Sequence, residues 1–189
     1  MGKNLTKSII SEHPLSSAHL QAILDALEYQ GYSNDCGPYT TASVINGLLG
    51  DKVNPATLAA EMSKPARKGL LYLIRRIPNW ATFPWGMVDI FRRYGLEARW
   101  KIWSSPDELL RLLKFGGICL PILGSWRPLG AHVMALIAWD PNKGWGFANT
   151  QYNHHNITWL EHKQFMRNWK FFMKPVIEVR YSPKKRGAS

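Results

Sequence analysis

Apolar residues change from helical to strand-like spacing along this 189-residue chain. Spacings of three to four positions predict amphipathic helices. These helices run from Ser16 or Ser17 to near Gly31, from about Cys36 to Gly50, and over 54–62, 84–94, 106–114 and 160–169. Alternating or continuous apolar runs predict strands at 96–102, 118–123, 132–139, 145–149 and 176–181. The stretch 65–79 is basic and is interrupted by Pro65, Gly69 and Pro78, which predicts a loop with some helix.

The order of these elements limits the fold class. Because helices come first and strands follow, the sequence predicts an α+β protein built around one central helix. A chain of 189 residues can bury a core without disulfides or a structural metal, and a hydrophobic fraction of 46% argues against disorder. We therefore expect a single domain over 1–181, followed by a basic tail over 182–189.

The charge balance limits the partners. The chain has 24 Lys and Arg against 13 Asp and Glu, a net charge of +11 that attracts anionic molecules. The basic residues are scattered, as in Arg75 with Arg76 and Arg92 with Arg93, and no nucleic-acid motif is present. A solvated basic surface is therefore favoured over specific nucleic-acid binding.

The two cysteines exclude a disulfide framework, and their surroundings lack the spacing of a zinc site. Nothing in the sequence requires a metal or an organic cofactor. The segment Met1 to Leu15 lacks the apolar stretch of a signal peptide, and no later window approaches the ~18 apolar residues of a spanning helix. We expect a cytoplasmic protein with no membrane segment.

Cys36 lies where the central helix is expected to begin. The amides and dipole of a helix start favour a thiolate, which is the nucleophilic form of cysteine. Gln30 stands six residues earlier, close enough for its amide to point at a developing oxyanion together with the Cys36 amide. Taken alone, Cys36 is better explained as a small buried residue at a helix start, and Gln30 as a surface polar residue that ends a helix.

His132 leads directly into a predicted strand and supplies the imidazole that a cysteine nucleophile needs. Asn149, 17 residues later, is our candidate for orienting that imidazole. A symmetric hairpin about Asn142 would set His132 opposite Tyr152, so Asn149 is reached only through a stagger, twist or bulge. Gln151 and Asp140 stay open as alternatives. Asp140 is the weaker of the two, because the run from Asp140 to Gly144 is typical of a turn.

The run from Gln30 to Pro38 resembles papain-like cysteine peptidases, where a Gln six residues before the Cys is a shared feature. Asp35, Cys36, Gly37 and Pro38 are most similar to the branch that trims bacteriocin leader peptides. The resemblance spans about Gln30 to Val176 and implies a central helix carrying the nucleophile, packed on an antiparallel sheet. The sequence differs from that branch in having Asn149 and Thr150 where Asp and Pro are usual, and in lacking fused transporter segments.

These residues predict a cysteine peptidase or amidase that works through a thioester acyl-enzyme on a peptide or protein substrate. The positive charge favours an acidic substrate. Two alternatives keep the same fold: an acyltransferase of transglutaminase-like type, and a binding domain without turnover. Cys119 lies in an apolar run and is expected to be an inert core thiol.

Overall fold

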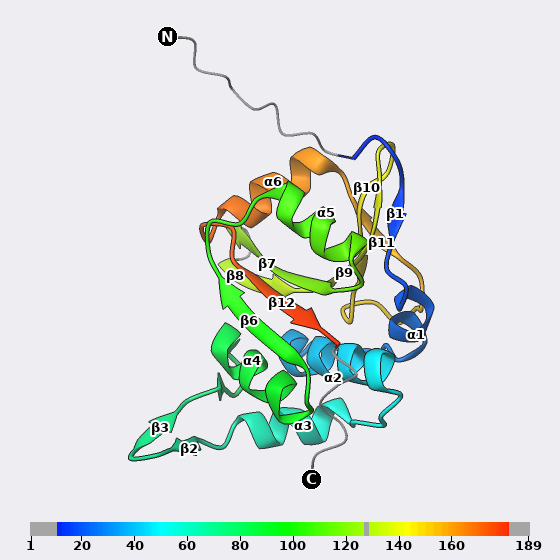
Figure 1. The fold of residues 1–189 in the computed structure, drawn as a ribbon. Coiled ribbons are helices and arrows are strands. Elements are labelled where there is room, and N and C mark those ends of the chain that lie inside the picture. Colours follow the sequence, from blue (N-terminus) through cyan, green and yellow to red (C-terminus); the bar gives the residue numbers. More distant parts are fainter. Residues whose placement is uncertain (1–10, 127–128, 182–189) are drawn as a thin grey trace.

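The computed structural model describes residues 11–126 and 129–181, so the predicted tail 182–189 lies outside the described part. Figure 1 shows a helix-rich N-terminal part followed by a sheet. The helices are α1 (Leu20–Asp25), α2 (Cys36–Leu49), α3 (Pro55–Met62), α4 (Pro84–Arg93), α5 (Pro106–Lys114) and α6 (His162–Lys170). The strands of the main sheet are β1 (Leu15–Ser16), β6 (Glu97–Lys101), β7 (Ile118–Trp126), β8 (Leu129–Val133), β9 (Ala135–Asp140), β10 (Gly144–Ala148), β11 (Thr158–Leu160) and β12 (Val176–Arg180).

Within the described residues these strands form one antiparallel sheet. Its main order is β11-β10-β9-β7-β12-β6, with β1 added beside β9 and β8 beside β7. The α+β class and the antiparallel sheet predicted from the sequence are thus confirmed.

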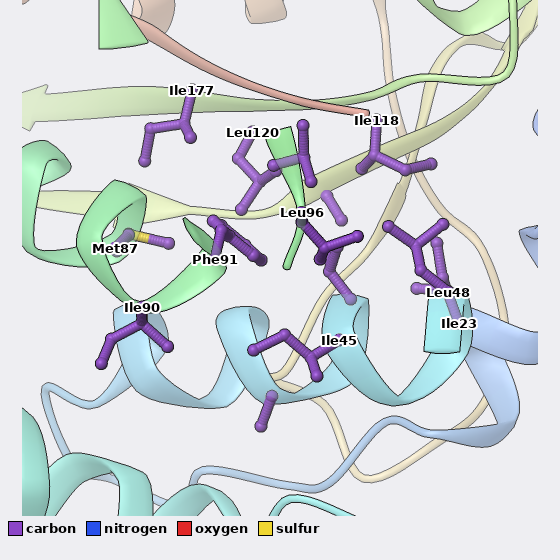
Figure 2. Packing of buried hydrophobic residues seen from close by; sticks show 14 of the residues in the cluster. Ile23, Ile45, Leu48, Met87, Ile90, Phe91, Leu96, Ile118, Leu120 and Ile177 are labelled. Atoms are coloured by element: carbon purple, nitrogen blue, oxygen red, sulfur yellow. The ribbon is translucent and has the colours of Figure 1, made fainter. Parts of the chain in front are cut away.

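Both faces of the sheet are buried. One core lies between the sheet and helices α1, α2 and α4, and a second lies between the sheet and helices α5 and α6. Successive residues alternate between the cores: on β7, Ile118 and Leu120 enter the first core while Cys119 enters the second. Figure 2 shows Ile45 and other labelled side chains of the first core between α2 and the strands. Burial on both faces explains why the C-terminal strands read as continuous apolar runs.

Helix α2 is the central helix, and Cys36 is its first residue. It ends at Gly50, whose φ of 68° is the left-handed conformation typical of a helix C-cap. Near its start, the Thr40 hydroxyl donates a hydrogen bond to the Val133 carbonyl at 3.2 Å. This bond joins the first turns of α2 to the end of β8, which carries His132.

Three local predictions were wrong. The segment 65–79 contains no helix; it forms β2 (Ala66–Lys68), β3 (Leu71–Leu73) and β4 (Arg76–Ile77), and β4 pairs with β5 (Ala81–Thr82). These two hairpins lie outside the main sheet, and β2–β3 extends away from the body in Figure 1. Such short strands leave too few positions for a detectable period.

The predicted strand 132–139 is two strands, β8 and β9, with a break at Met134. Both pair with β7, β8 through His132 and Leu123 and β9 through Leu136 and Cys119, and β9 also pairs with β10. The first helix is also shorter than expected and begins after His19, without a side-chain cap from Ser16 or Ser17. Ser16 lies in β1 instead, and the Ser17 hydroxyl accepts from the His19 amide.

Candidate active site

A cleft of about 500 Å³ lies at the start of α2. Gln30, Cys36 and His132, three of the four predicted site residues, line it together. The other lining residues come from the loop before α2, the starts of α2 and α4, the β4–β5 hairpin, the sheet, and the segments after β10 and α6. They are Ser33, Asn34, Gly37, Trp80, Ala81, Thr82, Met87, Ile122, Gly130, Ala131, Val133, Gln151 and Phe172. None of these described lining residues is Asp, Glu, Lys or Arg.

Cys36 is a partly exposed residue that lines the cleft, and its backbone starts α2. Burial is the largest influence on this group and raises the pKa of the Cys36 thiol, while backbone hydrogen bonds at Val133 and Gly37 act in the opposite direction. The neighbouring Asp35 charge raises the pKa further. The expectation that the helix start favours the thiolate therefore does not hold for the free protein, because desolvation outweighs it.

His132 contacts Asn149, the residue that the sequence favoured as its partner. The distance from His132 Nε2 to Asn149 Oδ1 is 2.8 Å, and the Gln151 backbone amide donates to the same oxygen at 3.0 Å. Because a backbone amide can only donate, the atom it meets must be the amide oxygen of Asn149. His132 consequently donates through Nε2–H, which leaves Nδ1 with the lone pair of a base.

A register shift changes the predicted hairpin pairing, but it moves the position opposite His132 only from Tyr152 to Gln151. His132 and Asn149 both lie beyond the β9–β10 ladder, His132 on β8 and Asn149 directly after β10. The β9–β10 hairpin pairs Gly146 with Ala138 but Phe147 with Leu136, so one residue of β9 is bulged. The alternative Asp140 accepts from the amides of Asn142 and Lys143, which is turn chemistry.

Gln30 is held from two sides. Its Oε1 accepts a 2.6 Å hydrogen bond from the Thr150 hydroxyl, and its Nε2 donates to the Ser33 carbonyl at 2.9 Å. Because the Ser33 carbonyl can only accept, the amide atom that it meets must be the nitrogen, and the oxygen therefore faces the Thr150 hydroxyl. Gln30 is only 7% exposed, yet it lines the cleft, and its Nε2 carries a second N–H bond that can donate.

Burial also lowers the pKa of His132, although the hydrogen bond to Asn149 opposes this effect. Together with the raised pKa of Cys36, this favours the uncharged forms of both groups. An uncharged histidine is a proton acceptor, which is the state that a general base requires.

The sequence analysis missed two contributors to the site. Thr150 orients Gln30 across 120 positions of sequence, and no local pattern links such distant residues. The β4–β5 hairpin forms a wall of the cleft through Trp80, Ala81 and Thr82, but it lay within or next to the segment interpreted as a loop. No sequence pattern identified this wall, and the exposure of Trp80 is visible only in the structure.

Cys119 differs from Cys36, as expected. It is 1% exposed in the second core, and burial strongly raises the pKa of its thiol. Among residues 11–126 and 129–181, no group of three His, Cys, Asp or Glu side chains could hold a metal ion. None of the helices in the described part is long and apolar enough to cross a membrane.

No protein-family model matches the sequence, and no curated protein matches it either. Several solved structures share the fold, among them the following three. A C39-like peptidase from Bacillus anthracis is 12% identical with a TM-score of 0.66, covering 90% of this chain and 98% of that chain. The peptidase domain of Streptococcus ComA, a bifunctional ABC transporter of a quorum-sensing pathway, is 19% identical with a TM-score of 0.58, covering 83% and 98% of the two chains.

The third structure is a double-glycine-motif protease from an AMS/PCAT transporter, solved in complex with the leader peptide. It is 15% identical with a TM-score of 0.56, covering 82% of this chain and 91% of that one. The resemblance predicted from the run Gln30 to Pro38 is therefore confirmed at the level of the fold. This chain has the papain-like fold of these C39-like and transporter-associated peptidase structures.

Proposed function

We propose that this protein is a cysteine peptidase with Cys36 as nucleophile, His132 as general base, Asn149 as the residue that orients the imidazole, and Gln30 as an oxyanion donor. The observation that carries the proposal is the His132–Asn149 hydrogen bond within reach of the cleft that Cys36 also lines. A neutral histidine with Nε2–H fixed in this way presents Nδ1 as the proton acceptor.

The reaction follows from these roles. Cys36 Sγ attacks the substrate carbonyl carbon while its proton passes to Nδ1 of His132. The oxygen, now negative, accepts from Gln30 Nε2–H and from the Cys36 backbone amide. The C–N bond then breaks, the amine leaves with the proton from His132, and a thioester remains on Cys36. Water, deprotonated by His132, hydrolyses the thioester and releases the acid.

The lining of the cleft supports a small, uncharged residue beside the scissile bond. Gly37, Ala81, Gly130 and Ala131 leave little side-chain bulk there, and the described lining residues carry no charge. One solved structure with the same fold is a double-glycine-motif protease bound to a leader peptide. We therefore propose a peptide with glycine before the cleaved bond as the substrate.

The net charge of +11 supports acidic residues elsewhere in that peptide, where they meet the basic surface outside the cleft. Raising the salt concentration should then raise KM for an acidic peptide and leave kcat unchanged. A KM that does not depend on ionic strength would remove this part of the proposal.

The proposal is tested with a panel of peptides that carry Gly-Gly, Ala-Ala or Leu-Leu before a reporter bond. We expect the purified protein to cleave the Gly-Gly peptide fastest and Cys36→Ala to be inactive. Cys119→Ala is the matched control, because it removes the other thiol from the buried core and should keep turnover. Cleavage by Cys36→Ala at the wild-type rate would overturn the proposed nucleophile.

Product mass spectrometry separates peptidase from acyltransferase. With an added amine, a peptidase gives the free acid as its main product, whereas a transferase gives the amide. A folded protein that cleaves no peptide of the panel would favour the binding domain.

The proposal also includes a single hydrolase domain over 1–181 with a basic tail over 182–189, and a reducing compartment such as the cytoplasm. Both Cys36 and Cys119 are free thiols, which is the usual state in that compartment.

A further inference from the structure

The short β4–β5 hairpin contacts the chain on both sides of Cys36. Arg76 of β4 and Thr82 of β5 are a cross-strand pair, so their side chains lie on the same face of the hairpin. Arg76 forms an ion pair with Asp35, and Thr82 packs against Gly37. The residues immediately before and after the proposed nucleophile are thus held by one pair of facing residues.

Arg76 is a buried anchor and not a surface charge, contrary to the interpretation of the basic residues as a solvated surface. It is 6% exposed, and besides Asp35 its Nη1 donates to the Ala59 carbonyl at 3.1 Å and to the Ser63 hydroxyl at 3.0 Å. One guanidinium therefore joins β4, the end of α3 and the start of α2. Asp35 makes no side-chain cap to α2, so its carboxylate is committed to Arg76.

The contact at Gly37 is close. A Cβ placed on Gly37 would lie 2.5 Å from the Thr82 Cβ, which is closer than such atoms approach in real structures. The tip of the hairpin adds a third attachment, because Asn34 Nδ2 donates to the Asn79 carbonyl at 2.9 Å. Between these attachments, the same hairpin presents Trp80, Ala81 and Thr82 to the cleft.

We propose that the hairpin 76–82 is a positioning clamp for Cys36, in which Arg76 acts through Asp35 and Thr82 acts through Gly37. The clamp sets the place and the electrostatic surroundings of the thiol, and it builds a substrate-facing wall from the same seven residues. The inference rests on the proposed role of Cys36 as nucleophile, but it is tested on the thiol itself.

The electrostatic part of the clamp has a definite sign. The Asp35 charge acts directly on the Cys36 thiol, Arg76 of β4 is paired with that carboxylate, and His132 of β8 lines the same cleft as Cys36. A carboxylate beside a thiol disfavours the thiolate, and a guanidinium bound to that carboxylate reduces the effect. Removal of Arg76 alone should therefore suppress the Cys36 thiolate, whereas removal of the Asp35 charge alone should promote it.

The experiment is the pH dependence of iodoacetamide alkylation at Cys36, read by peptide mass spectrometry with Cys119 as the internal buried thiol. We expect Arg76→Met to slow alkylation about tenfold at neutral pH and Asp35→Asn to speed it about tenfold, each a change of about one pKa unit. The double variant should return close to the wild-type profile, because both charges are gone.

Arg75 supplies the matched control. It is equally buried, at 4% exposed, but it pairs with Glu61 and Asp89 and donates to the Glu61 carbonyl. Arg75→Met should therefore lower thermal stability and leave the pH profile of Cys36 in place. The proposal is overturned if folded Arg76→Met and Asp35→Asn both keep the wild-type profile, or if Arg75→Met shifts it equally. If Arg76→Met does not fold, Asp35→Asn alone decides.

The steric part is tested by a suppressor pair. Gly37→Ala should slow Cys36 alkylation, because the new methyl group pushes the hairpin from the helix start. Adding Thr82→Gly removes the three side-chain atoms in its way and should restore the rate. A Gly37→Ala defect that the second change does not relieve would contradict the clamp. These alkylation results do not require turnover, so they stand apart from any failure of the peptidase assay.

Discussion

The His132–Asn149 contact makes a prediction that needs no substrate. Replacing Asn149 by Asp keeps the size of the side chain and the oxygen that faces His132 Nε2, but it adds a full negative charge at about the 2.8 Å separation. Asn149 is 4% exposed, so solvent screens that charge little. The backbone amide of Gln151 still donates to the same oxygen, so the geometry is kept.

The expected effect is a higher pKa for His132. An opposite charge in direct contact shifts a pKa by about 1 to 3 units toward the charged form. In the wild type, burial lowers the pKa of His132 and the neutral amide opposes burial only through one hydrogen bond. In Asn149→Asp the imidazolium gains a carboxylate partner, and the pKa of His132 should rise above that of the wild type.

The assay is an NMR titration of the histidine ring signals, with the His132 signal identified by its loss in His132→Asn. Asp140→Asn is the control, because Asp140 lies on the same hairpin but bonds only the turn amides of Asn142 and Lys143. It should leave the His132 titration unchanged. A pKa of His132 that stays in place or falls in Asn149→Asp would refute the inferred contact and tautomer.

Two further predictions concern Thr150 and the buried histidines. Thr150→Val removes the hydroxyl that holds the Gln30 amide and leaves the Gln30 oxygen as a buried acceptor without a donor, so it should lower the free energy of unfolding by about 1 to 3 kcal/mol. It should also lower kcat about tenfold with little change in KM, because Gln30 would no longer be held to donate to the oxyanion. An unaltered kcat would contradict the role of Gln30 at the oxyanion. Burial lowers the pKa of His132 and of His162, so the unfolded chain binds protons more readily and the unfolding free energy should fall as pH drops below about 6.5. His132→Asn should weaken this dependence in melts between pH 7 and pH 5, and an identical dependence in the variant would contradict the burial of His132.

The sequence predicted most of what local patterns can encode. The helix that starts at Cys36 and ends at Gly50 was found, because its apolar face and its glycine stop lie within one short window. The α+β class followed from the order of helices and strands. Asn149 could be named only as one of three candidates, since the break between β8 and β9 at Met134 and the bulge on β9 are not visible in the sequence pattern.

The rest depended on contacts between distant segments. Arg75 and Arg76 looked like surface charges because local patterns say nothing about the α3 carbonyls and carboxylates that bury them. The pKa direction of Cys36 was also missed. A helix start is visible in sequence, whereas desolvation by a wall from β4–β5 and β8 appears only in three dimensions.

The most direct test of the central claim uses a peptide that ends in Gly-Gly, with an α,β-unsaturated methyl ester in place of the scissile bond. A thiol adds to this group and forms a stable thioether. The rate of reaction between the peptide and the protein is followed by intact mass, and the modified residue is mapped by digestion. Our account predicts saturable labelling of Cys36 and none of Cys119, with a rate that falls about 100-fold or more in His132→Ala. Labelling of Cys36 that does not saturate and is equally fast in His132→Ala would contradict it.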